Sequence, residues 1–402
     1  MLRVQPAISS TGLPVSPFAM LADLLDGLEP GKPAIDLTVG EPRHPMPGFV
    51  IEAMDEAREG FAKYPPIRGN AEFRAAVADW LGRRYPPAAG LGGDSLGIIP
   101  LSGTREGLFF VAFSARARKP GADRPALLMP NPFYHAYAGA AQGAGLEPVY
   151  LNAGPDTGFL PELDAIDPAD MERAAAFFLC SPANPQGAVA GSAYLQKAIE
   201  LARQHDFILV ADECYSEVYT QAPPPGILEV AQRETGSLAN VVSMQSLSKR
   251  SNLPGLRVGF CAGDPAFVEA FASFRNVVAP QVPLPVQHAC ARLLAEESHV
   301  EASRQLYRDK FDAADRILEG RFGYARPGGG FFLWLDVSEH GSSESVTTKL
   351  WQRAGVRVLP GNFLARDDGN GMNPGEGFIR VAMVADQETT EDALGRIVRT
   401  LN

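Results

Sequence analysis

The chain has 402 residues, enough for two domains or for one large domain with a smaller partner. Hydrophobic residues make up 46% and charged residues 21%, a composition that excludes a disordered chain. A net charge of -11 without runs of Lys or Arg argues against nucleic acid or an anionic membrane as the main partner. No apolar run is long enough to cross a bilayer, and the proline-broken N-terminus lacks the apolar core of a signal peptide.

The cysteines and histidines form none of the usual metal motifs. Cys180, Cys214, Cys261 and Cys290 show no C-x-x-C spacing and lie mostly in apolar runs. We expect them to be buried free thiols in a reducing cytoplasm. The six histidines are scattered without an H-E-x-x-H motif, so no metal site is expected.

The first elements in chain order lead up to the main sheet. Residues 1–35 are expected to form an arm and a short amphipathic helix, and residues 35–42 a strand that ends in a turn. Helical periodicity covers 48–62 and 70–84, with a break at Tyr64-Pro65-Pro66-Ile67-Arg68-Gly69.

Residues 98–263 alternate apolar runs with helical stretches, which is typical of parallel strands covered by helices on both faces. The runs are 98–101, 126–129, 148–151, 175–180, 207–211, 241–244 and 258–262. After Pro285 the pattern changes to helices at 286–297 and 300–320, followed by strands at 330–336, 356–359 and 378–384.

These elements predict an α/β fold with a mostly parallel seven-stranded sheet between helices, and a smaller α+β domain. We expect residues 36–285 to form the large domain. Residues 1–35 and 286–402 are expected to form the small one.

The loop between the last two apolar runs of the large domain carries a lysine, Lys249. A lysine held between two buried strands can lose its charge and become an amine nucleophile. Ser246, Ser248 and Arg257 would supply hydrogen-bond donors and positive charge for a phosphate. Together they suggest a Schiff-base lysine beside pyridoxal phosphate, although the pattern alone is only moderately specific.

Further polar residues stand where the strands end, which is where doubly wound sheets place their ligands. Ser102-Gly103-Thr104 opens a helix and could bind an anion, or Thr104 could merely cap that helix. Tyr134 could stack on a flat ring, or form a structural aromatic corner.

Two more strand ends complete this set of polar residues. Asn184 precedes a proline, which holds it extended with its amide available to a ligand. Asp212 ends an apolar run and needs a cationic partner, which a protonated pyridine nitrogen would supply; it could instead be a strand-end cap.

In their joint order these motifs resemble those of the fold-type I pyridoxal-phosphate aminotransferases. They cover most of the chain: Gly40-Glu41-Pro42, Tyr64 with Gly69 and Arg74, Ser102-Gly103-Thr104, Pro132 to Tyr137, Asn184-Pro185-x-Gly187, Asp212-x-x-Tyr215, Ser246-x-Ser248-Lys249 with Arg257, and Arg380. The resemblance implies an enzyme that uses pyridoxal 5'-phosphate and works on small amino and keto acids.

The resemblance also implies roles for single residues. Lys249 would be the Schiff-base lysine and proton shuttle, Asp212 the partner of the pyridine nitrogen, and Tyr134 the stacking ring. Tyr215 and Asn184 would face the ring oxygen. The phosphate would be held by Ser102, Gly103, Thr104, Ser246, Ser248 and Arg257, and by Tyr64 of a partner subunit in a homodimer. Gly40 and Arg380 would bind substrate, Arg380 through the α-carboxylate.

Within this family the chain resembles the members that act on N-succinyl-diaminopimelate in lysine biosynthesis, with glutamate and 2-oxoglutarate as the other pair. The resemblance lies in residues 130–137, 147–152, 212–219, 246–257 and 281–287. Such a substrate carries extra carboxylates. Arg43 is the first candidate to bind them and Arg105 or Arg250 could contribute, although each could equally be a solvated surface arginine.

Other functions remain open or are disfavoured. An aminotransferase of broader specificity, or a lyase on the same fold, stays possible because fold and cofactor do not settle the reaction. Ser246-Leu247-Ser248-Lys249 matches the S-x-x-K motif of serine acyl-enzymes, but the Lys-Thr-Gly strand and a secretion signal are missing. A nicotinamide dehydrogenase would need the motif G-x-G-x-x-G between a strand and a helix, and the chain lacks that motif. A non-catalytic regulatory domain would not need the lysine, and the N-terminal arm is too short for a DNA-binding domain.

Overall fold

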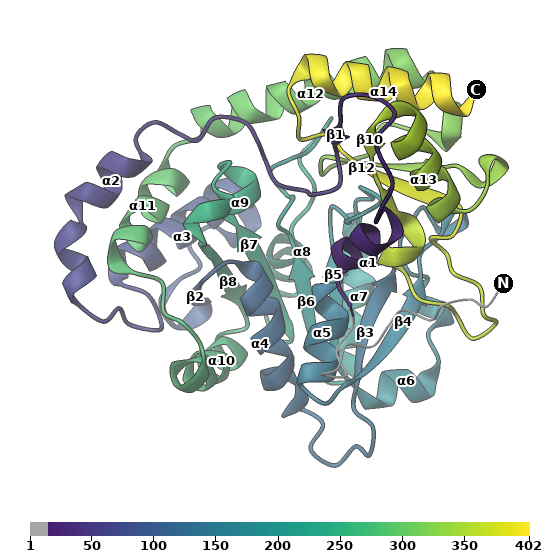
Figure 1. The fold of residues 1–402 in the computed structure, drawn as a ribbon. Coiled ribbons are helices and arrows are strands. Elements are labelled where there is room, and N and C mark those ends of the chain that lie inside the picture. Colours follow the sequence, from purple (N-terminus) through teal and green to yellow (C-terminus); the bar gives the residue numbers. More distant parts are fainter. Residues whose placement is uncertain (1–14) are drawn as a thin grey trace.

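The computed structural model describes residues 15–402 and places a seven-stranded sheet at the centre of the chain (Figure 1). The expected N-terminal arm falls largely outside the described residues. The strand order is β2-β8-β7-β6-β5-β3-β4. Their bounds are β2 Gly97–Leu101, β3 Ala126–Asn131, β4 Glu147–Asn152, β5 Ala174–Cys180, β6 Ile208–Asp212, β7 Val241–Ser246 and β8 Gly259–Gly263.

All neighbouring strands of this sheet are parallel except β8, which runs antiparallel to both β7 and β2. The predicted mostly parallel seven-stranded sheet is confirmed. The connection from β7 to β8 contains only the short helix Leu247–Arg250 and a 3-10 turn at Pro254–Leu256, and β8 returns antiparallel beside β7.

Two hydrophobic cores explain why the strands read as continuous apolar runs. Along β5, Phe177 and Leu179 pack into one core, whereas Ala176 and Phe178 pack into the other. The first core contains α3 Ala71–Arg84, α7 Ser192–Gln204, α8 Ile227–Thr235 and α11 Leu284–Ala295. The second contains α4 Thr104–Arg116, α5 Ala136–Gly143 and α10 Pro265–Val278.

A second group of elements lies above one end of this sheet (Figure 1). Its antiparallel sheet has the order β11-β12-β9, and a parallel pair joins β1 to β10. The strands are β1 Ile35–Asp36, β9 Phe332–Asp336, β10 Val356–Arg357, β11 Leu359–Pro360 and β12 Phe378–Ala382. The helices are α1 Pro17–Leu24, α12 Ser298–Leu318, α13 Ser343–Ala354 and α14 Gln387–Leu401. The boundaries proposed for the two domains stay a prediction.

The structure divides two elements that the sequence predicted as continuous. The strand expected at 356–359 consists of β10 and β11, which belong to different sheets. The helix expected at 48–62 consists of α2 Val50–Glu56 and a short 3-10 helix, Arg58–Ala62. The remaining short α-helices are α6 Pro168–Arg173 and α9 Leu247–Arg250. Within residues 15–402, no helix is long and apolar enough to span a membrane.

A buried ion-pair network joins the two groups of elements. Glu217, which follows β6 and is 5% exposed, pairs with Arg84 of α3 at 2.6 Å and with Arg304 of α12 at 3.3 Å. The Arg304 guanidinium also lies 4.0 Å from the ring centroid of Tyr219.

We expect Glu217→Ala to lower the free energy of unfolding by about 3–5 kcal/mol, because it removes the buried carboxylate that Arg84 and Arg304 share and leaves Arg84 without an ion-pair partner among residues 15–402. Glu301→Ala is the matched control, since Glu301 also pairs with Arg304 but its side chain is 55% exposed. It should lower the free energy by about 1 kcal/mol or less. Urea unfolding followed by circular dichroism measures both, and equal losses would contradict the buried network.

Candidate active site

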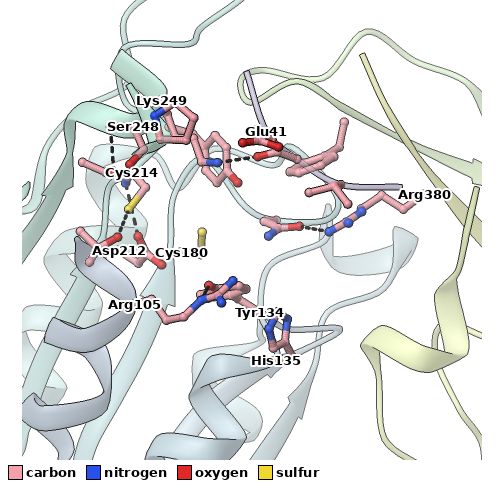
Figure 2. Close-up of a pocket in the computed structure, with 18 of the residues that line it drawn as sticks. Glu41, Arg105, Tyr134, His135, Cys180, Asp212, Cys214, Ser248, Lys249 and Arg380 are labelled. Carbon is pink, nitrogen blue, oxygen red and sulfur yellow. Dashed lines mark hydrogen bonds between the residues drawn. The ribbon is translucent and has the colours of Figure 1, made fainter. Parts of the chain in front are cut away.

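A cavity of about 440 Å³ lies where the parallel strands end, below the second group of elements (Figure 2). Most of the residues that the sequence singled out line it. They are Gly40, Thr104, Tyr134, Asn184, Asp212, Tyr215, Ser246, Ser248, Lys249, Arg257 and Arg380. Side chains from six different segments therefore converge on one space, as in other doubly wound sheets.

Lys249 lies on α9, directly after β7. The side chain of Ser246 caps this helix by accepting the backbone N–H of Ser248 at 3.3 Å. The lysine Nζ donates to the carbonyl of Gly40 and lies 5.5 Å from the ring centroid of Phe331. Burial lowers the pKa of Lys249 to about 8. A sizeable fraction of this amine is therefore neutral near pH 8, as a nucleophile requires.

Asp212 ends β6 and is buried at the opposite side of the cavity from Arg380 (Figure 2). The hydroxyl of Tyr137 donates to its Oδ2 at 2.6 Å, and the backbone N–H of Cys214 to its Oδ1 at 3.4 Å. Asp212 forms no ion pair with any residue that the structure describes, and burial raises its pKa. A cation at this point of the cavity would stabilise the carboxylate.

Arg380 of β12 is a buried cation that lacks an opposite charge among the described residues. Its Nη2 donates to the carbonyl of Thr38 at 2.6 Å and its Nη1 to Oδ1 of Asn184 at 2.9 Å, while its Nε has no partner within residues 15–402. Burial lowers its pKa to about 10. A carboxylate bound here would compensate the charge. Asn184 accepts from Arg380 through its oxygen, so only its NH₂ is left for a ligand.

The loop Ser102-Gly103-Thr104 faces Arg257 across the cavity edge. Gly103 has a φ of 84°, and a methyl group on it would collide with the Arg257 guanidinium. Only glycine therefore leaves room here for the arginine. The backbone N–H of Ser102 is already used, because it donates to Oε1 of Glu106 at 2.7 Å.

Tyr134 and Arg105 form the wall between Asp212 and Arg380 (Figure 2). Arg105 Nε donates to the Tyr134 hydroxyl at 2.7 Å, with the guanidinium 5.8 Å from the ring centroid. Tyr215 stands on the Phe331 side, where the two rings are 5.3 Å apart and nearly perpendicular.

Five of the residues predicted for the site do not line this cavity: Ser102, Gly103, Arg43, Arg250 and Tyr64. Arg43 donates to the carbonyl of Asp36 at 3.3 Å and lines a separate cavity of about 490 Å³. Arg250 is buried and pairs with Glu297 at 2.6 Å. Tyr64 is 98% exposed. Neither arginine reaches the cavity, so the geometry gives no support to Arg43 or Arg250 as substrate residues.

Some residues that line the cavity were not predicted as site residues from the sequence. Glu41, Phe18 and His135 also face the cavity, and Tyr137 holds Asp212. Tyr137 lies in the first turn of α5 and Tyr134 just before that helix, and their ring centroids are 5.6 Å apart. All four cysteines are free and buried, as expected, but Cys180 and Cys214 line the cavity.

The site fits pyridoxal phosphate by the chemistry of its residues. Asp212 lacks a cation, as the partner of a protonated ring nitrogen would before that ring binds. Lys249 has a lowered pKa suited to an aldehyde, and Arg257 lines the same cavity as the hydroxyl residues Ser246 and Ser248, which are donors suited to a phosphate. Arg380 keeps an unpaired N–H for a substrate carboxylate.

Comparisons with known proteins agree with this fit. The family model of aminotransferase class I and II matches residues 32–397. LL-diaminopimelate aminotransferases are among the similar proteins: one from Nitratidesulfovibrio vulgaris is 33% identical over 91% of both chains, and one from Aquifex aeolicus is 32% identical over 96% of this chain and 98% of its own.

Solved structures of similar proteins include two informative aminotransferases. One from Neisseria meningitidis is 37% identical, with a TM-score of 0.90 over 97% of this chain and 98% of its own. A probable N-succinyldiaminopimelate aminotransferase from Thermus thermophilus is 25% identical, with a TM-score of 0.83 over 96% of this chain and all of its own.

The lowered pKa of Lys249 predicts a pH dependence in the cofactor-free protein. Below pH 8 its amine is protonated, so its rate of trinitrophenylation should rise about tenfold per pH unit and level off above pH 8. Trinitrobenzenesulfonate labelling followed by peptide mass spectrometry measures this rate, and Lys249→Arg is the control that removes the labelled site. A midpoint at pH 10 or higher would contradict the burial of the amine.

Proposed function

The chain belongs to the class I and II aminotransferases, which depend on pyridoxal phosphate. We propose that its amino donor is N-succinyl-LL-2,6-diaminopimelate and that 2-oxoglutarate is the acceptor. One observation carries the proposal: the same cavity contains Arg380 and Arg105, two arginines with N–H groups left for carboxylates. A substrate with a carboxylate at each end would use both.

Arg105 replaces Arg43 as the candidate for the distal carboxylate. Its Nε bonds to Tyr134, while its two terminal nitrogens form no hydrogen bond with other described residues. Arg43 points into the second cavity instead. A bidentate contact from Arg105 would orient a succinyl carboxylate without moving the Tyr134 ring.

LL-diaminopimelate without the succinyl group is the second candidate substrate, because Glu41 also lines the cavity. The distal amino group of that compound is a free ammonium, which a carboxylate such as Glu41 would bind. The sequence relatives are named for this substrate. The succinyl group would remove that positive charge and add a carboxylate, so Glu41 and Arg105 favour different substrates.

The proposed mechanism assigns each residue a step in handling protons and charge. When bound, the cofactor supplies an aldehyde that takes the amino group and a ring that accepts electrons. Arg380 binds the substrate α-carboxylate, and Nζ of Lys249 removes the proton from the α-carbon. Asp212 keeps the ring nitrogen protonated, and Tyr137 holds Asp212 in place.

The remaining residues of the proposal hold the cofactor. Ser246, Ser248 and Arg257 would bind the phosphate from one side and the loop of residues 102–104 from the other. Tyr134 would stack on the ring, and Tyr215 with the NH₂ of Asn184 would bind the ring oxygen. The carbonyl of Gly40 accepts a hydrogen bond from Nζ of Lys249, so Gly40 would lie beside a substrate bound at the lysine.

A homodimer is proposed from exposed apolar side chains, two of which come shortly before Tyr64 in the chain. Phe61 and Ile51 are each 60% exposed and Val277 is 83% exposed. They lie on α2, the following 3-10 helix and the end of α10, with α11 in contact with the first two of these elements. Exposed apolar side chains of this kind would be buried against a second copy of the chain. In that dimer, Tyr64 would contact the phosphate site of the partner subunit.

A substrate panel tests the proposed donor. With 2-oxoglutarate as acceptor, kcat/KM should be highest for N-succinyl-LL-diaminopimelate, compared with LL-diaminopimelate, aspartate, alanine and aromatic amino acids. Arg105→Met should lower kcat/KM for the succinyl substrate by about 10- to 100-fold and spare alanine, because one charge-assisted contact is lost. Arg43→Met is the control. Preference for a simple amino acid, or turnover without a keto acid, would contradict the proposal.

Complementation tests the dimer. Tyr64→Ala and Lys249→Ala should each lose most activity, whereas subunits mixed by refolding should recover about a quarter of the wild-type activity, since half the dimers are hybrids with one intact site. Sedimentation velocity checks that dimers form. No recovery in a mixture that does form dimers would show that Tyr64 acts within its own subunit.

A further inference from the structure

A buried ion pair lies behind the loop of residues 102–104. Arg275 of α10 is fully buried, and both of its terminal nitrogens contact the carboxylate of Glu106 on α4, with Nη2 2.8 Å from Oε1. The two helices pack against each other and against β2 (Figure 1). The pair therefore joins two helices that flank the strand leading into the loop.

Glu106 holds the loop in its observed shape. It is the third residue of α4, and its Oε1 accepts the backbone N–H of Ser102, the residue before Gly103. Gly103 keeps its positive φ and lies against the Arg257 guanidinium. The carboxylate thus fixes, from the side away from the cavity, the turn that faces Arg257.

The negative charge of Glu106 would disfavour a phosphate bound at the loop of residues 102–104. A carboxylate in the first turn suits the dipole of α4, but it would repel a phosphate bound at that helix start. Arg275 supplies the opposite charge from inside the protein. It does not line the cavity, so it does not contact a phosphate bound there, and its ion pair is with Glu106.

We propose that Glu106 and Arg275 are positioning residues for the cofactor phosphate. Glu106 shapes the loop by accepting the Ser102 N–H, and Arg275 cancels the charge that Glu106 would otherwise present to the phosphate. This inference rests on the phosphate site proposed above, and it extends that site to two residues that touch neither cofactor nor substrate.

Equilibrium binding to the cofactor-free protein tests the inference, with pyridoxal phosphate and pyridoxal as paired ligands. Arg275→Met should weaken pyridoxal phosphate binding about tenfold and leave pyridoxal binding unchanged, because only the phosphate meets the unpaired carboxylate. The double variant Arg275→Met with Glu106→Gln should return to within about threefold of wild type, since that carboxylate is gone.

A second pair of variants separates charge from shape. Glu106→Gln keeps an oxygen for the Ser102 N–H and should bind pyridoxal phosphate at least as tightly as wild type. Glu106→Ala loses that acceptor and should bind about tenfold more weakly. Arg118→Met, which removes an ion pair with Asp206 beyond the far end of α4, should change neither affinity.

Several results would overturn the inference. Equal weakening for both ligands in Arg275→Met would show a general collapse of the site, and failure of the double variant to recover would show that the charge of Glu106 is irrelevant. If Arg275→Met does not fold, equal affinities of Glu106→Gln and Glu106→Ala for pyridoxal phosphate overturn it. If the wild-type protein binds pyridoxal as tightly as pyridoxal phosphate, the proposed phosphate site does not exist, and this inference fails with it.

Discussion

The active-site cavity depends on two buried charges that the protein leaves uncompensated. Asp212 and Arg380 are 4% exposed each, and neither has an ion-pair partner among residues 15–402. Isolated buried charges are unfavourable, so the fold must hold them in place with neutral hydrogen bonds, from Tyr137 to Asp212 and from Arg380 to Thr38 and Asn184. Ligands of opposite charge would relieve both, which couples binding of cofactor and substrate to stability.

The two sheets keep these charges apart in one cavity. Asp212 ends a central strand of the large sheet, whereas Arg380 lies in the middle strand of the antiparallel sheet. The network around Glu217 ties the two groups of elements together only a few residues beyond Asp212. The separation between Asp212 and Arg380 is therefore set by packed elements, and Lys249 lies on a short helix that lines the same cavity.

The sequence predicted the sheet and most of the cavity because both depend on local pattern. Parallel strands buried on two faces read as apolar runs, and polar residues at their ends meet at one edge. The sequence does not show which strands pair with each other. It therefore predicts one strand at 356–359, although β10 pairs with β1 and β11 pairs with β12. The sequence also does not show which cavity an arginine side chain lines. Arg43 comes two residues after Glu41, which lines the active-site cavity, but Arg43 lines the second cavity. Arg105, at the start of α4, lines the active-site cavity.

Every role proposed for the cavity rests on Lys249 as the lysine that holds the cofactor. Borohydride reduction of the cofactor-loaded protein, followed by peptide mass spectrometry, tests it most directly, because reduction fixes the cofactor to whichever amine carries it. We expect the label on Lys249 alone. Lys310 is the sharpest internal rival, since burial also lowers its pKa to about 8 and it lines the second cavity. Label on Lys310 with Lys249 unmodified would contradict the account.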